Sequence, residues 1–201
     1  MQITRKVYNL QSLNFLQGCN LKVGILGGSF DPAHLGHVQL SHQVLKSLGF
    51  DYIIWLVSVQ NPLKPKYKND IFTRAMEATK VEQNPRILIS TMEYDVKSNY
   101  IYNSLKTLVQ RFSTIDFTWI MGTDNTKDFH KWYRYEDIPN LCKIIIFDRP
   151  NSSRSLNFSR FSMKFKGIID KNQTSHIMTR DVMIYHGIMS SVASSLIRDK
   201  V

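Results

Sequence analysis

The sequence has only two cysteines among 201 residues, Cys19 and Cys142, and they do not form a CxxC pair. A disulfide framework or a cysteine-rich zinc site is therefore excluded, and free thiols in a reducing compartment are expected. Long hydrophobic runs are also missing. The longest uninterrupted apolar stretches, residues 53–57 and 144–147, are far too short to span a bilayer. These absences predict a cytoplasmic protein with its own hydrophobic core.

Three well-known motifs are absent as well. The chain contains no GxxxxGK[ST] phosphate loop, no GxGxxG dinucleotide fingerprint and no HExxH zinc motif. If the protein binds a nucleotide, it must do so in another way.

What the chain does have is basic charge. Lysine and arginine number 26 against 16 aspartates and glutamates, which gives a formal net charge of +10. Such a balance favours phosphorylated or polyanionic partners, but it does not separate nucleotides from nucleic acid. The best candidate for a nucleic-acid-binding stretch is residues 149–171, where basic residues alternate with three phenylalanines.

Apolar runs alternate with segments of helical spacing along most of the chain. This alternation predicts an α/β fold, a Rossmann-like doubly wound parallel sheet with helices on both faces. We expect one domain over residues 21–201, after a poorly ordered N-terminal extension of residues 1–20. The expected strands are residues 22–26, 52–57, 86–89, 117–121, 143–147 and 182–186, the expected helices are residues 35–48, 70–82, 101–112, 125–135 and a short one from 192, and residues 149–166 are expected to form a long loop.

Ligands bind such sheets at the carboxyl ends of the strands. Phosphate-binding residue types follow several of the expected strands, so we expect them to gather at one edge. The glycine pair 27–28 follows the first strand and lets the backbone turn tightly, although a plain turn explains a bare pair equally well.

His34 and His37, three residues apart at a helix start, would point to the same side. Two imidazoles there could donate hydrogen bonds to a phosphate, and zinc binding, which needs further ligands, is the rival interpretation.

The run GGSFDPAHLGH (residues 27–37) resembles the HxGH signature of the nucleotidyltransferase superfamily, in the form found in bacterial nicotinate-nucleotide adenylyltransferases. Further segments are similar to that family in the same order. They are NPLK at 61–64, MGTDN at 121–125, FHKW at 129–132, DRP at 148–150 and VASSLIR at 192–198, where Ala193 replaces the first serine of an ISSTxIR-like motif.

The resemblance implies transfer of the adenylyl group of ATP to nicotinate mononucleotide, a step of NAD biosynthesis. It implies that Mg²⁺ arrives with ATP and that no residue of the chain is a dedicated metal ligand. The implied catalytic residues are His34, His37, Lys64 and Arg198. The implied ATP-binding residues are Gly27, Gly28, Ser29, Phe30, Gly36, Ser194, Ser195 and Arg198, and the implied nicotinate-nucleotide-binding residues are Tyr100, Ser104, Gly122, Asp124 and Trp132.

Several of these positions have ordinary explanations too. Lys64 lies in a lysine run that would suit a solvated surface, Asp124 could cap a helix, and Trp132 could simply pack. Residues 99–104 match the family only at Tyr100 and, with serine for threonine, at Ser104. The preference for nicotinate is therefore less firmly implied than adenylyl transfer.

Two other functions stay open at this point. A sister adenylyltransferase could act on nicotinamide mononucleotide or phosphopantetheine, and a basic nucleic-acid-binding protein would be a non-enzymatic alternative. We expect ATP and nicotinate mononucleotide as partners, with neither a membrane nor nucleic acid. The sequence leaves the oligomeric state undetermined.

Overall fold

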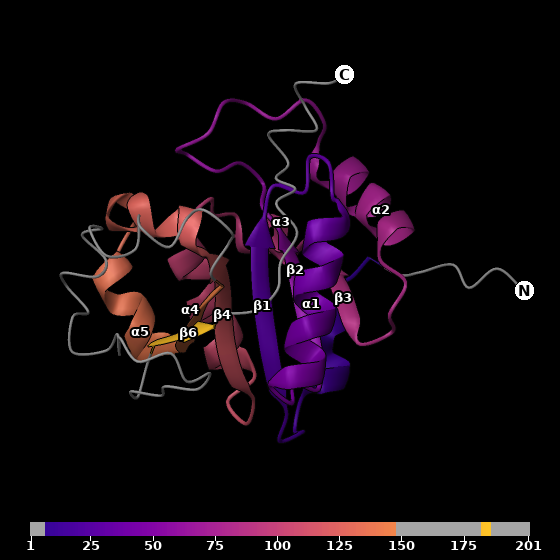
Figure 1. The fold of residues 1–201 in the computed structure, drawn as a ribbon, viewed down its shortest axis with the longest axis vertical. Coiled ribbons are helices and arrows are strands. Elements are labelled where there is room, and N and C mark those ends of the chain that lie inside the picture. Colours follow the sequence, from indigo (N-terminus) through magenta and orange to yellow (C-terminus); the bar gives the residue numbers. More distant parts are fainter. Residues whose placement is uncertain (1–6, 148–181, 186–201) are drawn as a thin grey trace, which may run out of the picture.

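A six-stranded parallel sheet forms the centre of the protein (Figure 1). The structure is a computed structural model that describes residues 7–147 and 182–185. The strands lie in the order β3-β2-β1-β4-β5-β6. Their bounds are Lys22–Gly28 (β1), Tyr52–Val57 (β2), Ile87–Ser90 (β3), Asp116–Gly122 (β4), Lys143–Phe147 (β5) and Val182–Tyr185 (β6). This confirms the predicted Rossmann-like doubly wound sheet.

Helices cover both faces of the sheet (Figure 1). On one face, α1 (Leu35–Ser47) and α2 (Ile71–Val81) pack against alternate side chains of the strands. On the other face lie α3 (Met92–Val96), α4 (Ile101–Arg111) and α5 (Ile138–Leu141). Because apolar side chains are buried on both faces of the sheet, the strand sequences are continuous hydrophobic runs.

Most predicted elements are confirmed, but residues 125–135 are not one helix. They fall in the short 3-10 turns η2 (Thr123–Lys127), η3 (Phe129–Lys131) and the start of η4 (Tyr135–Asp137). The backbone is extended at Trp132 and left-handed at Arg134, which interrupts any continuous helix. The predicted loop at 149–166 and the helix from 192 lie outside the described residues.

The expectation for the N-terminal extension needs correction for residues 7–20. Leu13 and Leu16, in the 3-10 helix η1 (Ser12–Leu16), are buried in the same core as α4. Tyr8 pairs with Ser90 at the end of β3, and its amide donates to the Ile89 carbonyl at 2.8 Å. A short 3-10 helix buries too few residues to produce a periodic pattern, so this packing could not be predicted from sequence.

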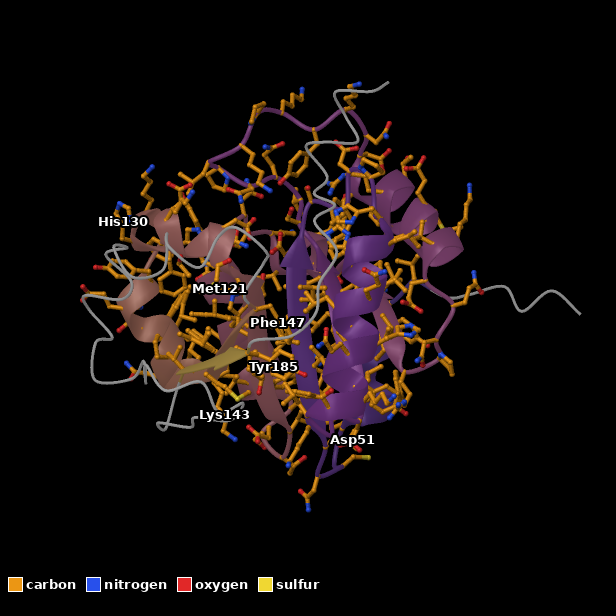
Figure 2. All side chains as sticks on the ribbon, viewed as in Figure 1. Asp51, Met121, His130, Lys143, Phe147 and Tyr185 are labelled. Carbon is orange, nitrogen blue, oxygen red and sulfur yellow. The ribbon has the colours of Figure 1, made fainter. Side chains whose placement is uncertain are left out.

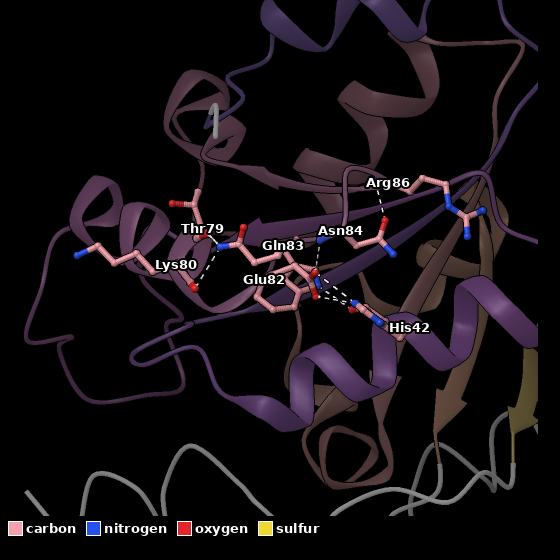
Figure 3. Close-up of polar contacts among 9 residues, drawn as sticks. His42, Thr79, Lys80, Glu82, Gln83, Asn84 and Arg86 are labelled. Atoms are coloured by element: carbon pink, nitrogen blue, oxygen red, sulfur yellow. Dashed lines mark hydrogen bonds and ion pairs between the residues drawn. The ribbon is translucent and has the colours of Figure 1, made fainter. Parts of the chain in front are cut away.

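A buried carboxylate ties α1 to the turn between α2 and β3 (Figure 3). Glu82 is only 1% exposed, and its oxygens lie 3.2 Å from Nε2 of His42. The Asn84 amide donates to the same carboxylate at 2.6 Å. His42, which belongs to no sequence motif, therefore has a structural role.

The amino-terminal edge of the sheet carries charged side chains. Asp51 accepts a hydrogen bond from the Lys22 amide at 2.8 Å, and Lys143 pairs with Asp116 at 2.6 Å. Figure 2 places Asp51 and Lys143 together at this edge, near the base of the strands. In the part of the chain that the structure describes, no helix has the length and apolarity that crossing a membrane requires.

We predict that Leu13→Ala lowers the free energy of unfolding by ~2–5 kcal/mol, because it leaves a cavity in the core. The measurement is urea denaturation of the full chain. Gln17→Ala, an exposed change beside the same turn, is the control and should stay within ~0.5 kcal/mol of the parent. An equally small loss for Leu13→Ala would show that the N-terminal segment does not support the core.

Candidate active site

The segment of residues 27–30, called the glycine turn below, contains the last two residues of β1 and the two residues that follow, so the predicted strand end at residue 26 is two residues too early. Its first glycine is required by a close contact with β4. A Cβ atom on Gly27 would lie 2.0 Å from Cη2 of Trp119, and Trp119 is only 3% exposed. Only glycine therefore fits there without displacing the indole ring. The turn is joined to the end of β2, because the Ser58 amide donates to the Gly28 carbonyl at 2.9 Å.

The phenylalanine of the motif is an anchor for this turn. Phe30 has a positive φ of 48°, a conformation that non-glycine residues rarely adopt. Its ring is fully buried, stacks on Trp55 with a centroid distance of 5.0 Å, and lies 4.7 Å from the ring of His37. The side chain belongs to the core, so only the backbone of Phe30 can face a ligand in this conformation.

The two histidines of the motif lie together at the start of α1, as predicted. Their ring centroids are 3.8 Å apart. Nδ1 of His34 accepts the Gly36 amide at 3.1 Å, and Nδ1 of His37 accepts the His34 amide at 3.2 Å. Because each Nδ1 is an acceptor, the proton of each neutral ring sits on Nε2. Each histidine therefore carries its N–H donor at Nε2. The amide of Gly36 is the donor to His34, the residue that caps α1.

The loop after β2 carries Lys64 and is held by its own polar side chains. Nε2 of Gln60 donates to the carbonyls of Lys64 and Pro65 at 3.2 and 3.1 Å. The hydroxyl of Tyr67 accepts the Asn61 amide at 3.0 Å. These contacts fold the loop back on itself, and Lys64 is exposed at its tip.

Aromatic rings form the opposite side of the site. The rings of Tyr100, at the start of α4, and Tyr133 lie 4.8 Å apart, and each residue is about half exposed. Trp132 is half-buried and meets Trp119 edge-on at 6.1 Å. These rings offer flat apolar surfaces of the kind that bind an aromatic ligand.

A cleft that is open to solvent joins these parts. It lies at the carboxyl ends of the strands and includes the junction of β1 with β4, where the strand order reverses. Of the predicted residues within the described ranges, six line the cleft, namely Gly27, Gly28, Ser29, Lys64, Tyr100 and Trp132. The other seven do not line it, namely Phe30, His34, Gly36, His37, Ser104, Gly122 and Asp124.

The predicted residues outside the lining differ in their surroundings. Ser104 is fully buried in α4, and its hydroxyl has no hydrogen-bond partner among the residues that the structure describes. Gly122 ends β4, while Asp124 is exposed in η2. Residues 194, 195 and 198 lie outside the described part of the chain, and their predicted roles stay predictions.

Two charged residues of this region were not predicted as site residues. Arg74 of α2 is 0% exposed, and its guanidinium donates to the carbonyls of Ser29 and, at 2.7 Å, Ser58. Glu93 of α3 is 4% exposed, lines the cleft, and accepts the Val59 amide at 3.0 Å. A signal for Arg74 was present, because it falls on the same helical face as Ile71, Ala75 and Ala78.

Burial has a clear effect on the Glu93 carboxyl. Removal from water raises its pKa to about 7, against the lowering effects of the Val59 amide and the Arg74 charge. Burial also lowers the pKa of Arg74, against the opposite effect of nearby acidic groups. The cleft therefore holds a carboxyl group that changes charge near neutral pH.

Comparison with known proteins places the chain in a family. The family model described as cytidylyltransferase-like matches residues 25–200, which is most of the chain. The chain belongs to the cytidylyltransferase-like family.

Relatives within the cytidylyltransferase-like family narrow this assignment. A Methylorubrum extorquens protein named "Probable nicotinate-nucleotide adenylyltransferase" is 31% identical over 185 residues, which cover 90% of this chain and all of that protein. A Roseobacter denitrificans protein of the same name is 39% identical over 128 residues, which cover 64% of each, so that match spans less than two thirds of the relative. The chain thus groups with the nicotinate-nucleotide adenylyltransferases.

A solved structure supports the fold assignment. The nicotinic acid mononucleotide adenylyltransferase of Plasmodium falciparum, complexed with NaAD, superposes with a TM-score of 0.66. The match covers 89% of this chain and 83% of that one, at 17% identity. At this identity the likeness shows that the two chains share a fold.

We predict that Glu93→Gln raises the free energy of unfolding at alkaline pH. The pKa of Glu93 is higher in the folded chain than its ordinary value of 4.5, so its contribution to stability is greatest below pH 4.5 and is lost as the pH rises through about 7. The loss amounts to ~3 kcal/mol, and glutamine, which cannot ionise, avoids it. Urea denaturation at pH 5 and pH 8 measures the difference.

The free energy of unfolding of Glu93→Gln, relative to that of the parent, should be higher at pH 8 than at pH 5. Glu77→Gln, a half-buried glutamate of α2 outside the cleft lining, is the matched control and should show no such gain. A constant difference between Glu93→Gln and the parent at both pH values would contradict the raised pKa.

Proposed function

We propose that this protein transfers the adenylyl group of ATP to nicotinate mononucleotide, giving nicotinate adenine dinucleotide and pyrophosphate for NAD biosynthesis. The observation that carries the proposal is the cleft itself. It places a glycine turn and a lysine loop on one side and an aromatic surface on the other, at the carboxyl edge of the sheet. Membership of the nicotinate-nucleotide adenylyltransferases supports the same reaction.

The proposed chemistry needs no nucleophile from the protein. An oxygen of the acceptor's 5′-phosphate attacks the α-phosphorus of ATP, a new P–O bond forms, and the bond to the β-phosphate oxygen breaks to release pyrophosphate. The protein contributes position and charge stabilisation. The amides of Gly28 and Ser29 would approach the phosphates, the Nε2–H groups of His34 and His37 would donate to the α-phosphate oxygens, and Lys64 would face the charge from across the cleft.

The aromatic side would hold the pyridine nucleotide. Trp132 and Tyr100 line the cleft, and Trp132 would stack on the pyridine ring. The backbone of residues 131–133 is the candidate source of N–H donors to the ring carboxylate. Ser104, Gly122 and Asp124 were predicted to bind this nucleotide; their positions favour indirect support, since none of them lines the cleft.

Other parts of the proposal rest on the sequence resemblance. Ser194, Ser195 and Arg198 would bind the β- and γ-phosphates. Among the described residues, no cluster of three His, Cys, Asp or Glu side chains could hold a metal ion. Independently of this, Mg²⁺ would enter with ATP, because it prefers phosphate and water ligands. A cytoplasmic location, a role without nucleic acid or membrane, and the presence of ATP and nicotinate mononucleotide as partners belong to the same proposal.

We predict that His34→Ala and His37→Ala each lower kcat by ~10²–10³, the usual loss for one donor to a developing charge. His34→Ala also removes a helix cap and should cost ~1 kcal/mol of stability. Pyrophosphate release at saturating ATP and acceptor is the measurement. Gln39→Ala, exposed on α1, is the control. Near-parent turnover in both histidine variants would remove the pair from the mechanism.

The acceptor preference is a separate prediction. A site that meets a carboxylate with N–H donors has no acceptor for the amide of nicotinamide mononucleotide. It should favour the acid by ~10²-fold or more in kcat/KM, because a mispaired buried polar group costs ~1–3 kcal/mol and charged hydrogen bonds are also lost. Equal values for the two nucleotides would refute the nicotinate assignment and leave adenylyl transfer intact. Activity with phosphopantetheine alone would support a sister enzyme.

A further inference from the structure

The segment of residues 58–61, directly after β2, is held by side chains from both faces of the sheet. Arg74 comes from α2, which packs on one face, and Glu93 comes from α3, which packs on the other. Both side chains reach Val59. Nη2 of Arg74 donates to the Val59 carbonyl at 3.2 Å, and the Val59 amide donates to Glu93 at 3.0 Å. The peptide groups on either side of this residue are thus fixed.

The same guanidinium also reaches the glycine turn. It donates to the carbonyl of Ser29 and to that of Ser58, so a single buried group joins the glycine turn at the end of β1 to the loop after β2. Its Nε donates to the Asn69 carbonyl at 3.0 Å. Three different backbone segments therefore take their relative positions from Arg74.

Tyr67 completes this arrangement. The guanidinium lies over its ring, with the Arg74 Cζ atom 4.5 Å from the ring centroid. Its hydroxyl lies 3.2 Å from the Ser58 hydroxyl and accepts the Asn61 amide. Asn61 in turn begins the turn that ends at Lys64, whose amide donates to the Asn61 carbonyl at 3.0 Å. A continuous set of contacts runs from the two buried charges to the lysine loop.

We propose that Arg74 and Glu93 are positioning residues, which fix segment 58–61, and through it Lys64, relative to the glycine turn before any ligand binds. This inference rests on the proposed adenylyl transfer. Such preorganisation matters because phosphoryl-type transfer is accelerated almost entirely by position and charge, and a small displacement of a loop lowers the rate.

The ionisation of Glu93 gives the proposal a pH-dependent readout. The ionised carboxylate is a stronger acceptor for the Val59 amide than the protonated acid is. Arg74 is the charged group that acts on it from α2, and Lys64, Lys131, Tyr100 and Tyr133 line the same cleft. As the pH falls through about 7, the hold on segment 58–61 should weaken.

The experiment compares Glu93→Gln, Tyr67→Phe and Arg74→Lys with the parent. Glutamine keeps an acceptor but no charge, and phenylalanine keeps the ring beneath Arg74 but no hydroxyl. We measure amide hydrogen exchange of residues 58–61 without ligand, and kcat and KM for MgATP from pH 6 to pH 8. In each of the three variants, we expect the amides of residues 58–61 to exchange about tenfold faster than in the parent. We also expect kcat/KM for MgATP to fall about tenfold, chiefly because KM rises. The KM of the parent should rise about fivefold from pH 8 to pH 6, and that of Glu93→Gln should not change.

Matched controls are Glu77→Gln and Arg86→Gln, which neutralise charges outside the cleft lining and should leave exchange and kinetics unchanged. Arg74→Lys could fail to fold, but Glu93→Gln removes only a charge and tests the proposal alone. Parent-like exchange with reduced kcat/KM would mean that Glu93 contacts substrate directly, and parent-like values of both would overturn the proposal outright. If no acceptor were turned over even by the parent, adenylyl transfer would fail, while the exchange data would still decide the positioning.

Discussion

A sheet that is covered on both faces has little room for polar chemistry. In this protein, apolar side chains from the helices fill both faces, so functional side chains can gather only where the strands end. The strand order reverses between β1 and β4, and the helices after these strands diverge there. Gly27 lies at that junction, and its lack of a side chain lets the Trp119 ring fill the space that a Cβ atom would need. The strand order thus determines where the cleft lies, and the lack of a side chain at Gly27 determines the shape of its floor.

The backbone that leaves the sheet at this edge has a further requirement. Its carbonyl groups no longer have strand partners, and a buried carbonyl without a donor is costly. Arg74 supplies several donors from one planar group, which a lysine could not do. Within residues 7–147 and 182–185, no carboxylate pairs directly with this buried charge, and the carbonyl dipoles, the Tyr67 ring and the field of nearby acidic residues offset the cost of burial in part. The same contacts therefore supply hydrogen-bond donors to the loop carbonyls and offset part of the cost of burying the Arg74 charge.

Much of this arrangement could be predicted from sequence, for physical reasons. Continuous apolar strands and helical spacing predicted the sheet and its helices, including the helix expected over residues 70–82, where Asp70 caps α2 by accepting two amides. The same approach missed η1, because one 3-10 turn has no periodicity. It could not indicate that the ring of Phe30, a predicted ATP-binding residue, is buried beneath its own turn, because a motif carries no information on burial. Arg74 and Glu93 were missed as site residues since their roles depend on contacts between elements far apart in the sequence.

The two sides of the cleft are built on different principles, and this difference bears on how ligands would enter. The side formed by the glycine turn and segment 58–61 is joined by hydrogen bonds to buried charges, and such charge-assisted contacts fix geometry closely. The opposite side depends on ring contacts between half-exposed tyrosines, which have weaker orientational demands. Phosphate groups need fixed donors, whereas a planar base needs only a surface that adapts to it. Lys64 also lines the cleft on the firmly held side, so that side is the one whose charge suits an anion.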